Sequence, residues 1–362
     1  MPLPAELADL DVPVALLVDA SNGQVLFERG AQRRFVPASV TKVMTLYTAF
    51  EMIDAGKLSP DHYLTVSPET WMEWRGKGST MYLNADDRVL VSDLLTGIAN
   101  VSANDASCVL AEEVSGSLQG WTAQMNSKAR SLGMTQSHFA TPNGWPDEGR
   151  TFTNARDLAV LGRALMGRHP EKVARFMGRK EFAYGGITQT NHDPMLGRVQ
   201  GADGLKTGYT NEAGFTYLGT AQRYDQRLIL VVAGATRKWE RARFARGLAE
   251  WGFTAFDRQT VFEKGVYVGA AKVQNGDVRS VELITDRAVS INVPKGSADT
   301  MRVSIRYDGP LRAPIVEGDK VATLVIETPD IEPAQVPLLA KQSVGEAGPL
   351  DRIVNALAGW LS

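Results

Sequence analysis

The chain has 362 residues, which is long enough for two domains, and its hydrophobic content of 44% is ordinary for a globular protein. Its 39 basic and 41 acidic residues give a net charge of −2, so the sequence carries no electrostatic footprint of nucleic-acid binding. One cysteine excludes an internal disulfide, and the four histidines show no metal-ligand spacing, so we expect neither a metal nor another cofactor.

The N-terminal segment resembles no targeting sequence. Met1 to Pro4 lack the basic and apolar regions of a signal peptide. No run in the chain approaches the roughly 18 apolar residues that a membrane-spanning helix needs.

The first chemical motif, Ser39-Val40-Thr41-Lys42, follows Pro37 and precedes an apolar run, so it is predicted to open a helix. Residues three apart share a helix face, which places the Lys42 amine beside the Ser39 hydroxyl. A serine needs an adjacent base to act as a nucleophile, and a desolvated lysine near a second cation has the lowered pKa of a base. The pair is predicted to be nucleophile and base, although taken alone the motif is more often a chance string in a capped helix.

The second motif, Ser102-Ala103-Asn104, is expected on a short loop between two helices, the first of them capped by Ser92 or Asp93. Ser102 is a candidate for passing a proton between Lys42 and a leaving amine. Asn104 is a candidate for holding a substrate amide or for positioning Lys42. The alternative is that the motif only caps the following helix.

The third motif, Lys206-Thr207-Gly208, is predicted to lie on a strand that leads into a β-hairpin. The segments 215–221 and 228–234 are alternating or apolar runs typical of strands, and a turn-like segment at 211–214 precedes them. Lys206 and Thr207 are suited to binding a carboxylate, and Gly208 to the close approach of a substrate backbone. A substrate peptide is expected to pair with the edge of this strand.

Short strands alternate with turns after residue 257, which predicts a small all-β domain of sandwich type at 258–344. The expected strands are 278–284, 289–293, 301–307, 321–327 and 335–339. This region has no polar constellation, so a spacer or interaction role fits it better than a second active site. Residues 1–257 are the expected catalytic domain, and the tail at 345–362 has the apolar spacing of an amphipathic helix.

In this order and at these separations, the three motifs describe one active site for acyl transfer by a serine. The chain resembles the low-molecular-mass penicillin-binding proteins of the 5/6 type, which are serine-type D-alanyl-D-alanine carboxypeptidases. The resemblance covers about residues 10–345. Beyond the motifs it extends to the segments 17–28, 71–83, 151–159, 203–210 and 251–253.

This resemblance implies an α/β (α+β) penicillin-binding and β-lactamase-like transpeptidase fold, in which helices flank an antiparallel sheet, followed by the all-β domain. It implies that Ser39 is acylated, that Lys42 is its base, and that Ser102, Asn104 and Lys206 complete the proton network.

Substrate binding is also implied by the resemblance, at Thr207, Gly208 and Tyr209. The backbone N–H groups of Ser39 and Tyr209 would form the oxyanion hole. Tyr209 stands where many relatives carry histidine. Arg241 occupies the position from which relatives bind the terminal carboxylate, and Arg237 and Arg243 remain as alternatives.

The implied reaction is hydrolysis of the terminal D-Ala from peptidoglycan stem peptides, with β-lactams as inhibitors and a role in cell-wall synthesis and cell shape. Such an enzyme is periplasmic, so we expect that a leader has been removed. The tail is expected to make peripheral contact with the inner membrane, or else to pack on the β domain or on a partner chain. Its one basic residue from position 349 onward, Arg352, predicts weak and mainly hydrophobic attachment.

Two rival functions are a β-lactamase of the same fold and a non-catalytic penicillin-binding sensor or scaffold. A β-lactamase needs a deacylating glutamate, for which Glu148 and Glu181 are the chief candidates, and neither lies in a Glu-x-x-Leu-Asn pattern. Retention of all three motifs argues against a sensor. His192 is interpreted as a loop residue near the site rather than a triad member, and Cys108 as an inert core residue.

Overall fold

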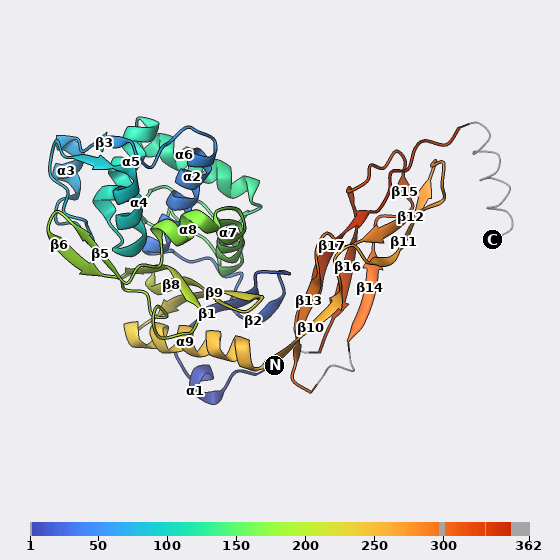
Figure 1. Ribbon diagram of the computed structural model, residues 1–362. Helices are drawn as coiled ribbons and strands as arrows, with labels where there is room; N and C mark the ends of the chain where they lie inside the picture. The colour runs from blue at the N-terminus through green and yellow to red at the C-terminus, as the bar shows by residue number, and fades with distance from the viewer. Residues whose placement is uncertain (1, 297–300, 330, 349–362) are drawn as a thin grey trace. The chain divides into compact units, whose positions relative to one another are not determined.

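The computed structural model describes residues 2–296, 301–329 and 331–348. They form two compact units, one of residues 2–20 and 27–253 and the other of residues 21–26 and the described residues between 254 and 348 (Figure 1). The amphipathic helix predicted in the tail lies, from residue 349 onward, outside the described residues.

A five-stranded sheet with the order β2-β1-β9-β8-β7 forms the centre of the larger unit. The pairs β1–β9, β9–β8 and β8–β7 are antiparallel, and β7 lies at the sheet edge. The strands are β1 Val14–Asp19, β2 Val25–Arg29, β7 Ala202–Thr210, β8 Gly214–Arg223 and β9 Gln226–Ala235. The third motif therefore lies on an edge strand that leads into the predicted hairpin.

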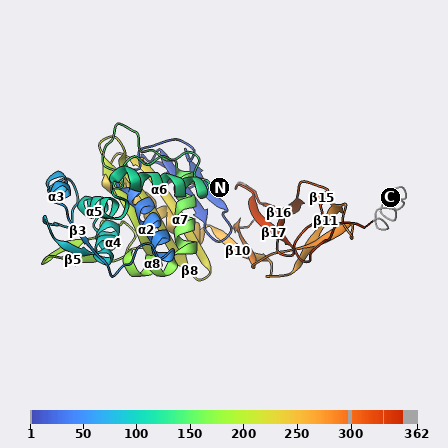
Figure 2. The same cartoon turned by 90° about the horizontal axis from the view of Figure 1, so that it is seen from above.

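Helices cover both faces of this sheet (Figures 1 and 2). Helix α9 (Lys238–Thr254) brings Gly252 against Leu228, whereas α7 (Ala155–Arg168) brings Gly162 against Ile229. Because neighbouring strand residues point to opposite faces, these two contacts place the two helices on opposite sides of the sheet. The run 228–232 in β9 is fully buried for that reason, and it is continuously apolar rather than alternating.

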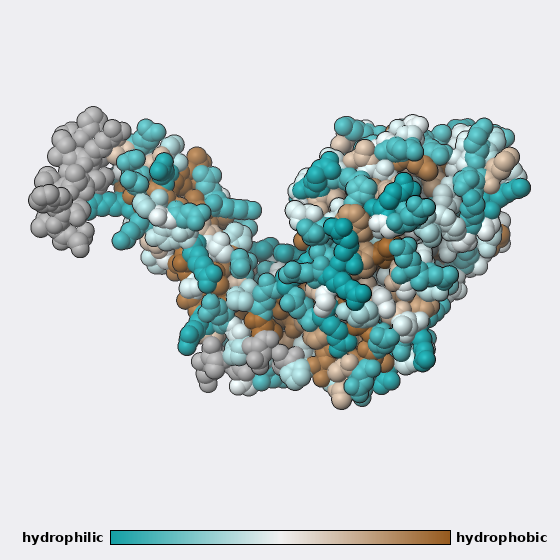
Figure 3. Space-filling model, turned by 180° about the vertical axis from the view of Figure 1, so that it is seen from behind, coloured by the Kyte–Doolittle hydropathy of each residue, from teal (hydrophilic) through white to brown (hydrophobic). Residues whose placement is uncertain are grey.

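The described part of the larger unit contains further helices, which include those that carry the first two motifs. They are α1 Ala5–Ala8, the 3₁₀ helix η1 Ala38–Thr41, α2 Lys42–Asp54, α3 Pro68–Trp74, α4 Val91–Asn100, α5 Asn104–Ser115, α6 Leu118–Ser131 and α8 Pro170–Phe176. Two small hairpins complete the unit, formed by β3 Tyr63–Thr65 with β4 Arg88–Leu90 and by β5 Glu181–Tyr184 with β6 Ile187–Thr190. On the face drawn in Figure 3, hydrophobic residues of this unit lie in small areas among hydrophilic ones.

The predicted N-cap of α4 is wrong. The helix begins at Val91, and Leu90 stands at the N-cap without a side-chain hydrogen bond. The backbone N–H groups of Val91 and Ser92 instead donate to the carbonyl oxygens of His62 and Pro60, both at 2.9 Å. Because a neighbouring segment satisfies these free donors, neither Ser92 nor Asp93 is needed as a cap.

The smaller unit is all-β, as predicted, and two sheets share its core. One pairs β10 (Phe256–Phe262) with β13 (Val289–Pro294), and the other has the order β14-β16-β17-β12-β11-β15. The further strands are β11 Tyr267–Gln274, β12 Ser280–Ile284, β14 Arg302–Arg306, β15 Leu311–Arg312, β16 Lys320–Glu327 and β17 Ala334–Ala340. All five expected strands are present, and β10, β11 and β15 are additional to them. Val289, Ile291 and Val293 of the first sheet join Leu283, Leu324 and Leu338 of the second in one buried cluster.

In the part of the chain that the structure describes, no helix is both long enough and apolar enough to cross a membrane.

Candidate active site

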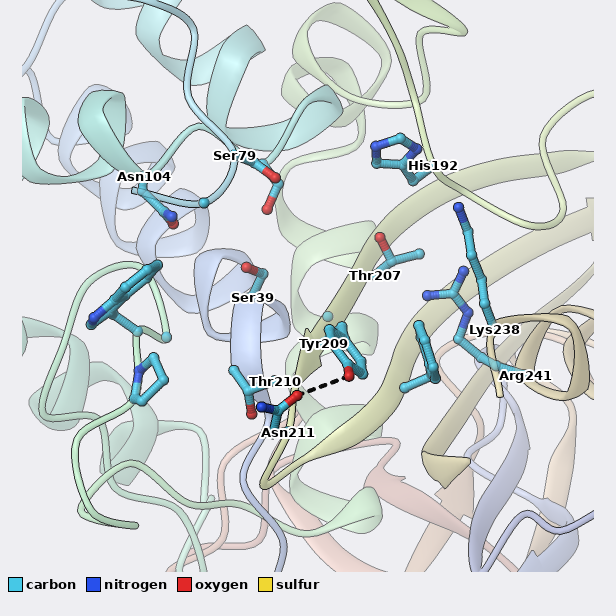
Figure 4. Close-up of a pocket in the computed structure, with 17 residues that line it drawn as sticks. Ser39, Ser79, Asn104, His192, Thr207, Tyr209, Thr210, Asn211, Lys238 and Arg241 are labelled. Carbon is cyan, nitrogen blue, oxygen red and sulfur yellow. Dashed lines mark hydrogen bonds between the residues drawn. The ribbon is translucent and has the colours of Figure 1, made fainter. Parts of the chain in front are cut away.

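The three motifs meet at one cavity of about 500 Å³ in the larger unit (Figure 4). Of the predicted site residues, the cavity is lined by Ser39, Ser102, Asn104, Thr207, Gly208, Tyr209 and Arg241. Lys42 and Lys206 are buried behind this lining. The structure thus brings together segments that lie up to about 200 positions apart in the sequence, as the resemblance implies.

Ser39 lies in η1, immediately before α2. The preceding residue, Ala38, has a φ of 49°, in the left-handed region that residues with a side chain seldom adopt. The 3₁₀ turn nearly superimposes residues three apart, so the Lys42 Nζ lies 3.0 Å from the Ser39 Oγ. The helix predicted to begin at this motif therefore opens with a tighter turn than expected, and the two side chains meet as predicted.

The Lys42 amine is fully buried and has three oxygen partners. Besides the Ser39 Oγ, it contacts the Asn104 Oδ1 at 2.8 Å and the carbonyl oxygen of Asn143 at 2.6 Å. Burial, together with the nearby positive charge of Lys206, holds the pKa of Lys42 well below its usual range. A neutral amine has two N–H groups and one lone pair. Because both carbonyl groups can only accept, they take the two N–H groups, and the lone pair is left facing the Ser39 hydroxyl.

The second motif begins in the three-residue connection 101–103 between α4 and α5 and ends in α5 itself. Ser102 has a φ of 64°, a strained value for serine, and its side chain lines the cavity. Asn104 is the first residue of α5, and Ala103 stands at the N-cap with no side-chain cap. The Asn104 amide does not cap the helix: its oxygen accepts from Lys42, and its Nδ2 donates to the carbonyl oxygen of Lys77 at 2.9 Å.

Sequence reasoning missed Asp105, which holds the loop on the cavity rim. Its carboxylate accepts the backbone N–H groups of Met81 at 3.1 Å and Leu83 at 3.3 Å, and burial raises its pKa. Asn104 fixes the same loop, because its backbone N–H donates to the Ser79 carbonyl oxygen at 2.8 Å. The only hint in the sequence was the position of Asp105 directly after the second motif.

Gly208 permits close packing of β7 against η1. A Cβ at this position would lie 2.7 Å from the carbonyl oxygen of Pro37, 3.0 Å from the Ser39 nitrogen and 2.4 Å from the Thr216 Oγ1. The Thr216 hydroxyl in turn donates to the Pro37 carbonyl oxygen at 3.0 Å. We expected Gly208 to make room for a substrate backbone; the structure adds that it first makes room for the backbone of the nucleophile itself.

Lys206 is buried beneath the third motif, and its Nζ donates to the carbonyl oxygen of Thr207 at 2.9 Å. Burial and the positive charge of Arg241 lower the pKa of Lys206 to about 7, although the negative charge of Asp193 raises it in part. The Asp193 carboxylate accepts the Tyr217 hydroxyl at 2.9 and 3.0 Å and the Met195 N–H at 2.8 Å. Asp193 and Tyr217 were not predicted, because no pattern in the sequence links them.

Arg241, His192 and Lys238 line one end of the cavity (Figure 4). Arg241 is only 3% exposed, and its Nε is buried without a hydrogen-bond partner among the described residues. Arg237 and Arg243 are exposed and do not belong to the lining. Partial burial and the charges of Lys238, Lys206 and Arg241 lower the pKa of His192. This end of the cavity is therefore suited to a carboxylate.

Tyr209 lies on the open side of the same cavity and is 52% exposed. Its ring stacks on Phe215 with the centroids 4.3 Å apart, and its hydroxyl donates to the Asn211 Oδ1 at 3.0 Å (Figure 4). The side chain is therefore directed toward Asn211 rather than toward Ser39.

No aspartate or glutamate is among the described residues that line the cavity. Glu148 and Glu181, the candidates for a deacylating glutamate, lie outside the lining. Cys108 is fully buried, accepts the Asn143 Nδ2 at 3.5 Å and has a pKa raised by burial, so it is a core residue as predicted.

A serine whose hydroxyl faces a buried lysine, beside an edge strand and a cationic end, defines a serine enzyme of the penicillin-binding class. A family model described as D-alanyl-D-alanine carboxypeptidase (Peptidase S11) matches residues 4–237. A second, described as the C-terminal domain of penicillin-binding protein 5, matches residues 256–346. The chain therefore belongs to the D-alanyl-D-alanine carboxypeptidase family, and the predicted serine-type carboxypeptidase activity is confirmed.

Relatives and solved structures agree with this assignment. The chain is 34% identical over 356 residues to D-alanyl-D-alanine carboxypeptidase DacC of Escherichia coli. The matched region covers 96% of this chain and 88% of that protein. It is 29% identical over 352 residues to DacF of Bacillus subtilis, with coverages of 96% and 89%. The structure of penicillin-binding protein 5 from Haemophilus influenzae matches with a TM-score of 0.82 at 29% identity, covering 96% of this chain and 100% of that one. The predicted fold class is thus confirmed.

Proposed function

We propose that this enzyme removes the terminal D-Ala from peptidoglycan stem peptides ending in D-Ala-D-Ala, through an acyl-enzyme on Ser39. The observation that carries the proposal is the 3.0 Å contact of the Ser39 Oγ with the buried Lys42 amine. Two carbonyl oxygens occupy the other directions around that nitrogen, so its lone pair is available only toward the serine.

In the acylation step, the Ser39 Oγ forms a bond with the carbonyl carbon of the penultimate D-Ala while its proton passes to Lys42. The carbonyl oxygen takes the negative charge, which the N–H groups of Ser39 and Tyr209 stabilise. Such donors typically contribute about 2.7–4 kcal/mol each. Gly208 supports this geometry, because it brings β7 close to the Ser39 nitrogen.

Collapse of this intermediate breaks the peptide bond. The terminal D-Ala leaves as an amine and takes up the proton from Lys42 through the Ser102 hydroxyl. Water then attacks the ester with Lys42 again as base, which frees Ser39. Throughout, Lys206 and Asn104 maintain the proton network, and Thr207 with Arg241 holds the terminal carboxylate of the substrate.

We also infer that β-lactams acylate Ser39. A β-lactam carbonyl is an acyl donor that meets the same nucleophile and the same N–H donors. The structure of penicillin-binding protein D2 from Listeria monocytogenes, in its ampicillin-bound form, matches with a TM-score of 0.62 at 30% identity. It covers 70% of this chain and all of that one.

The test combines mass spectrometry with steady-state kinetics. Penicillin-treated protein should carry one adduct, on the peptide that contains Ser39, and Ser39→Ala should carry none. The untreated enzyme should release D-Ala from a peptide ending in D-Ala-D-Ala much faster than it hydrolyses penicillin. An undiminished adduct in Ser39→Ala would exclude Ser39 as the nucleophile, and dominant penicillin hydrolysis would favour a β-lactamase.

The rival functions receive less support from the site. A β-lactamase requires a carboxylate that activates the deacylating water, and the described cavity lining holds no acidic side chain. A sensor without turnover would not need the converging Ser39, Lys42 and Asn104 contacts.

We propose a catalytic domain at 1–257, an all-β domain at 258–344 and a tail at 345–362, in a periplasmic protein.

The tail is proposed to contact the inner membrane peripherally through its apolar residues. With one basic residue from position 349 onward, anionic lipid should contribute only about 1 kcal/mol. Sedimentation with liposomes, for the full chain and for a chain ending at residue 348, tests this proposal. Identical sedimentation of the two proteins would exclude the membrane role.

A further inference from the structure

A second cavity of about 480 Å³ adjoins the catalytic cavity. We call it the Trp145 groove; its lining includes Trp74 of α3, Gln119 and Ala123 of α6, and Trp145 and Arg150 of the following loop. Trp145 also lines the catalytic cavity, so one side chain bounds both. The two cavities are therefore neighbours across a single indole ring.

Packing holds this shared indole in place. The Trp145 ring makes an edge-to-face contact with Trp74, with the centroids 5.6 Å apart, and it approaches the rim loop at Gly78. Its backbone N–H donates to the Asn143 Oδ1 at 3.0 Å, and the carbonyl oxygen of the same Asn143 accepts from Lys42. The boundary of the groove is thus built on the residue that orients the general base.

The charges in the catalytic cavity set the direction in which a substrate lies. Its cationic end, with Arg241 and Lys238, takes the C-terminal carboxylate, and Figure 4 places Asn104 on the opposite side of Ser39. The acyl side of the peptide therefore runs from Ser39 toward Asn104 and Trp145. An extended chain covers about 3.3–3.6 Å per residue, so a sugar attached beyond the fourth residue before the scissile bond of a pentapeptide lies roughly 13–14 Å farther along.

Resting on the proposed function, we infer that the Trp145 groove binds the glycan end of the same substrate, the N-acetyl sugar that carries the stem peptide. Indole rings suit the apolar face of a sugar, and amide and hydroxyl groups suit its N-acetyl and hydroxyl groups. Gln119 is exposed, and its side-chain amide has no hydrogen-bond partner within the described ranges. The described lining holds one cationic side chain, Arg150, and one anionic side chain, Glu73, so recognition rests on the indole and amide groups rather than on charge.

The experiment compares two substrates: a diacetylated tripeptide ending in D-Ala-D-Ala, and a disaccharide pentapeptide. Ala123 is exposed, lines the groove and is absent from the catalytic cavity, so Ala123→Trp fills the groove alone. We expect kcat/KM for the disaccharide pentapeptide to fall about 10-fold or more, and that for the tripeptide to stay within about twofold. Ser127→Trp is the matched control, because Ser127 is exposed on the same helix and lines neither cavity.

Gln119→Ala provides a second variant that does not depend on a bulky side chain. It should raise KM for the disaccharide pentapeptide and leave the tripeptide unchanged. An equal loss on both substrates, or no loss on either in both variants, would overturn the inference. Failure of the proposed function is distinguishable, because the wild-type enzyme would then release no D-Ala from the tripeptide and take no penicillin adduct on Ser39.

Discussion

The Lys42 Nζ lies 2.6 Å from the carbonyl oxygen of Asn143, a shorter distance than the 3.0 Å to the Ser39 Oγ. The Asn143 carbonyl group thus fixes the orientation of the Lys42 amine about its terminal bond. On the proposed mechanism, Lys42→Ala removes the base and should slow acylation by labelled penicillin about 10²–10⁴-fold. Lys57→Ala, which changes an exposed lysine outside this network, is the control. Wild-type acylation by Lys42→Ala at neutral pH would place the base elsewhere.

A methyl group at position 208 should separate β7 from the nucleophile. Gly208→Ala places a Cβ 2.7 Å from the Pro37 carbonyl oxygen, so a backbone must move, at a typical cost of about 1–3 kcal/mol. We expect a lower melting temperature and slower acylation. Gly167→Ala is the matched control, because this helical glycine has open space around it, and it should be neutral or slightly stabilising. Unchanged acylation in Gly208→Ala would contradict the close packing described here.

The carboxylate of Asp193 should set the alkaline limit of activity. Its negative charge raises the pKa of Lys206, which stands at about 7. Asp193→Asn keeps the shape but removes the charge, so the pKa of Lys206 falls and less of its cation is present at pH 8. If the cation assists substrate binding, the alkaline limb of kcat/KM moves to lower pH, and activity at pH 8 drops about 3–10-fold. Tyr217→Phe keeps the charge and should not move the limb downward.

Lys206 should also make stability depend on pH. Its pKa is lowered from 10.5 in a free side chain to about 7 in the folded protein, so between these values the unfolded chain binds more protons. Stability therefore rises with pH across this window, by about 1–3 kcal/mol from pH 7 to 9.5. Urea unfolding of the wild type and of Lys206→Met isolates this effect, since the variant should lack that part of the rise. Parallel pH profiles would contradict the prediction.

Arg241 should anchor the free C-terminus of the substrate. Arg241→Ala removes a buried cation from the cavity, and losing one partner of such a charge pair typically costs about 2–5 kcal/mol. D-Ala release should therefore fall at least about 30-fold. Arg237→Ala and Arg243→Ala change exposed residues outside the lining, and they should have small effects. Equal losses in all three variants would refute the assignment to Arg241.

The motifs and their strand and helix context were predictable from the sequence because they depend on local rules. The spacing of Ser39 and Lys42 requires only one helical turn, and the hairpin after Gly208 follows from apolar alternation. The all-β character of the smaller unit was equally readable from its turns. These features arise within about 30 neighbouring residues, where spacing alone decides the geometry.

Contacts between distant segments were not predictable in this way. The carbonyl oxygen of Asn143 reaches Lys42 from about 100 residues away, and any residue type carries such a group. The Asp193 carboxylate, in the loop before β7, accepts the Tyr217 hydroxyl of β8, and no spacing rule joins the two residues. The start of α4 was misplaced for the same reason, since a remote backbone segment satisfies its free N–H groups.

Cys108 has a consequence for experiments on this enzyme. It is the one thiol of the chain, it is fully buried, and its sulfur touches the residue that orients Lys42. An alkylating reagent can reach it only while the helices around the catalytic lysine are apart, so the labelling rate under native conditions measures how often that region opens. An acyl group on Ser39 that stabilises the closed form should slow the labelling. The rate at which Cys108 is alkylated in the wild-type enzyme thus reports local opening of the catalytic centre.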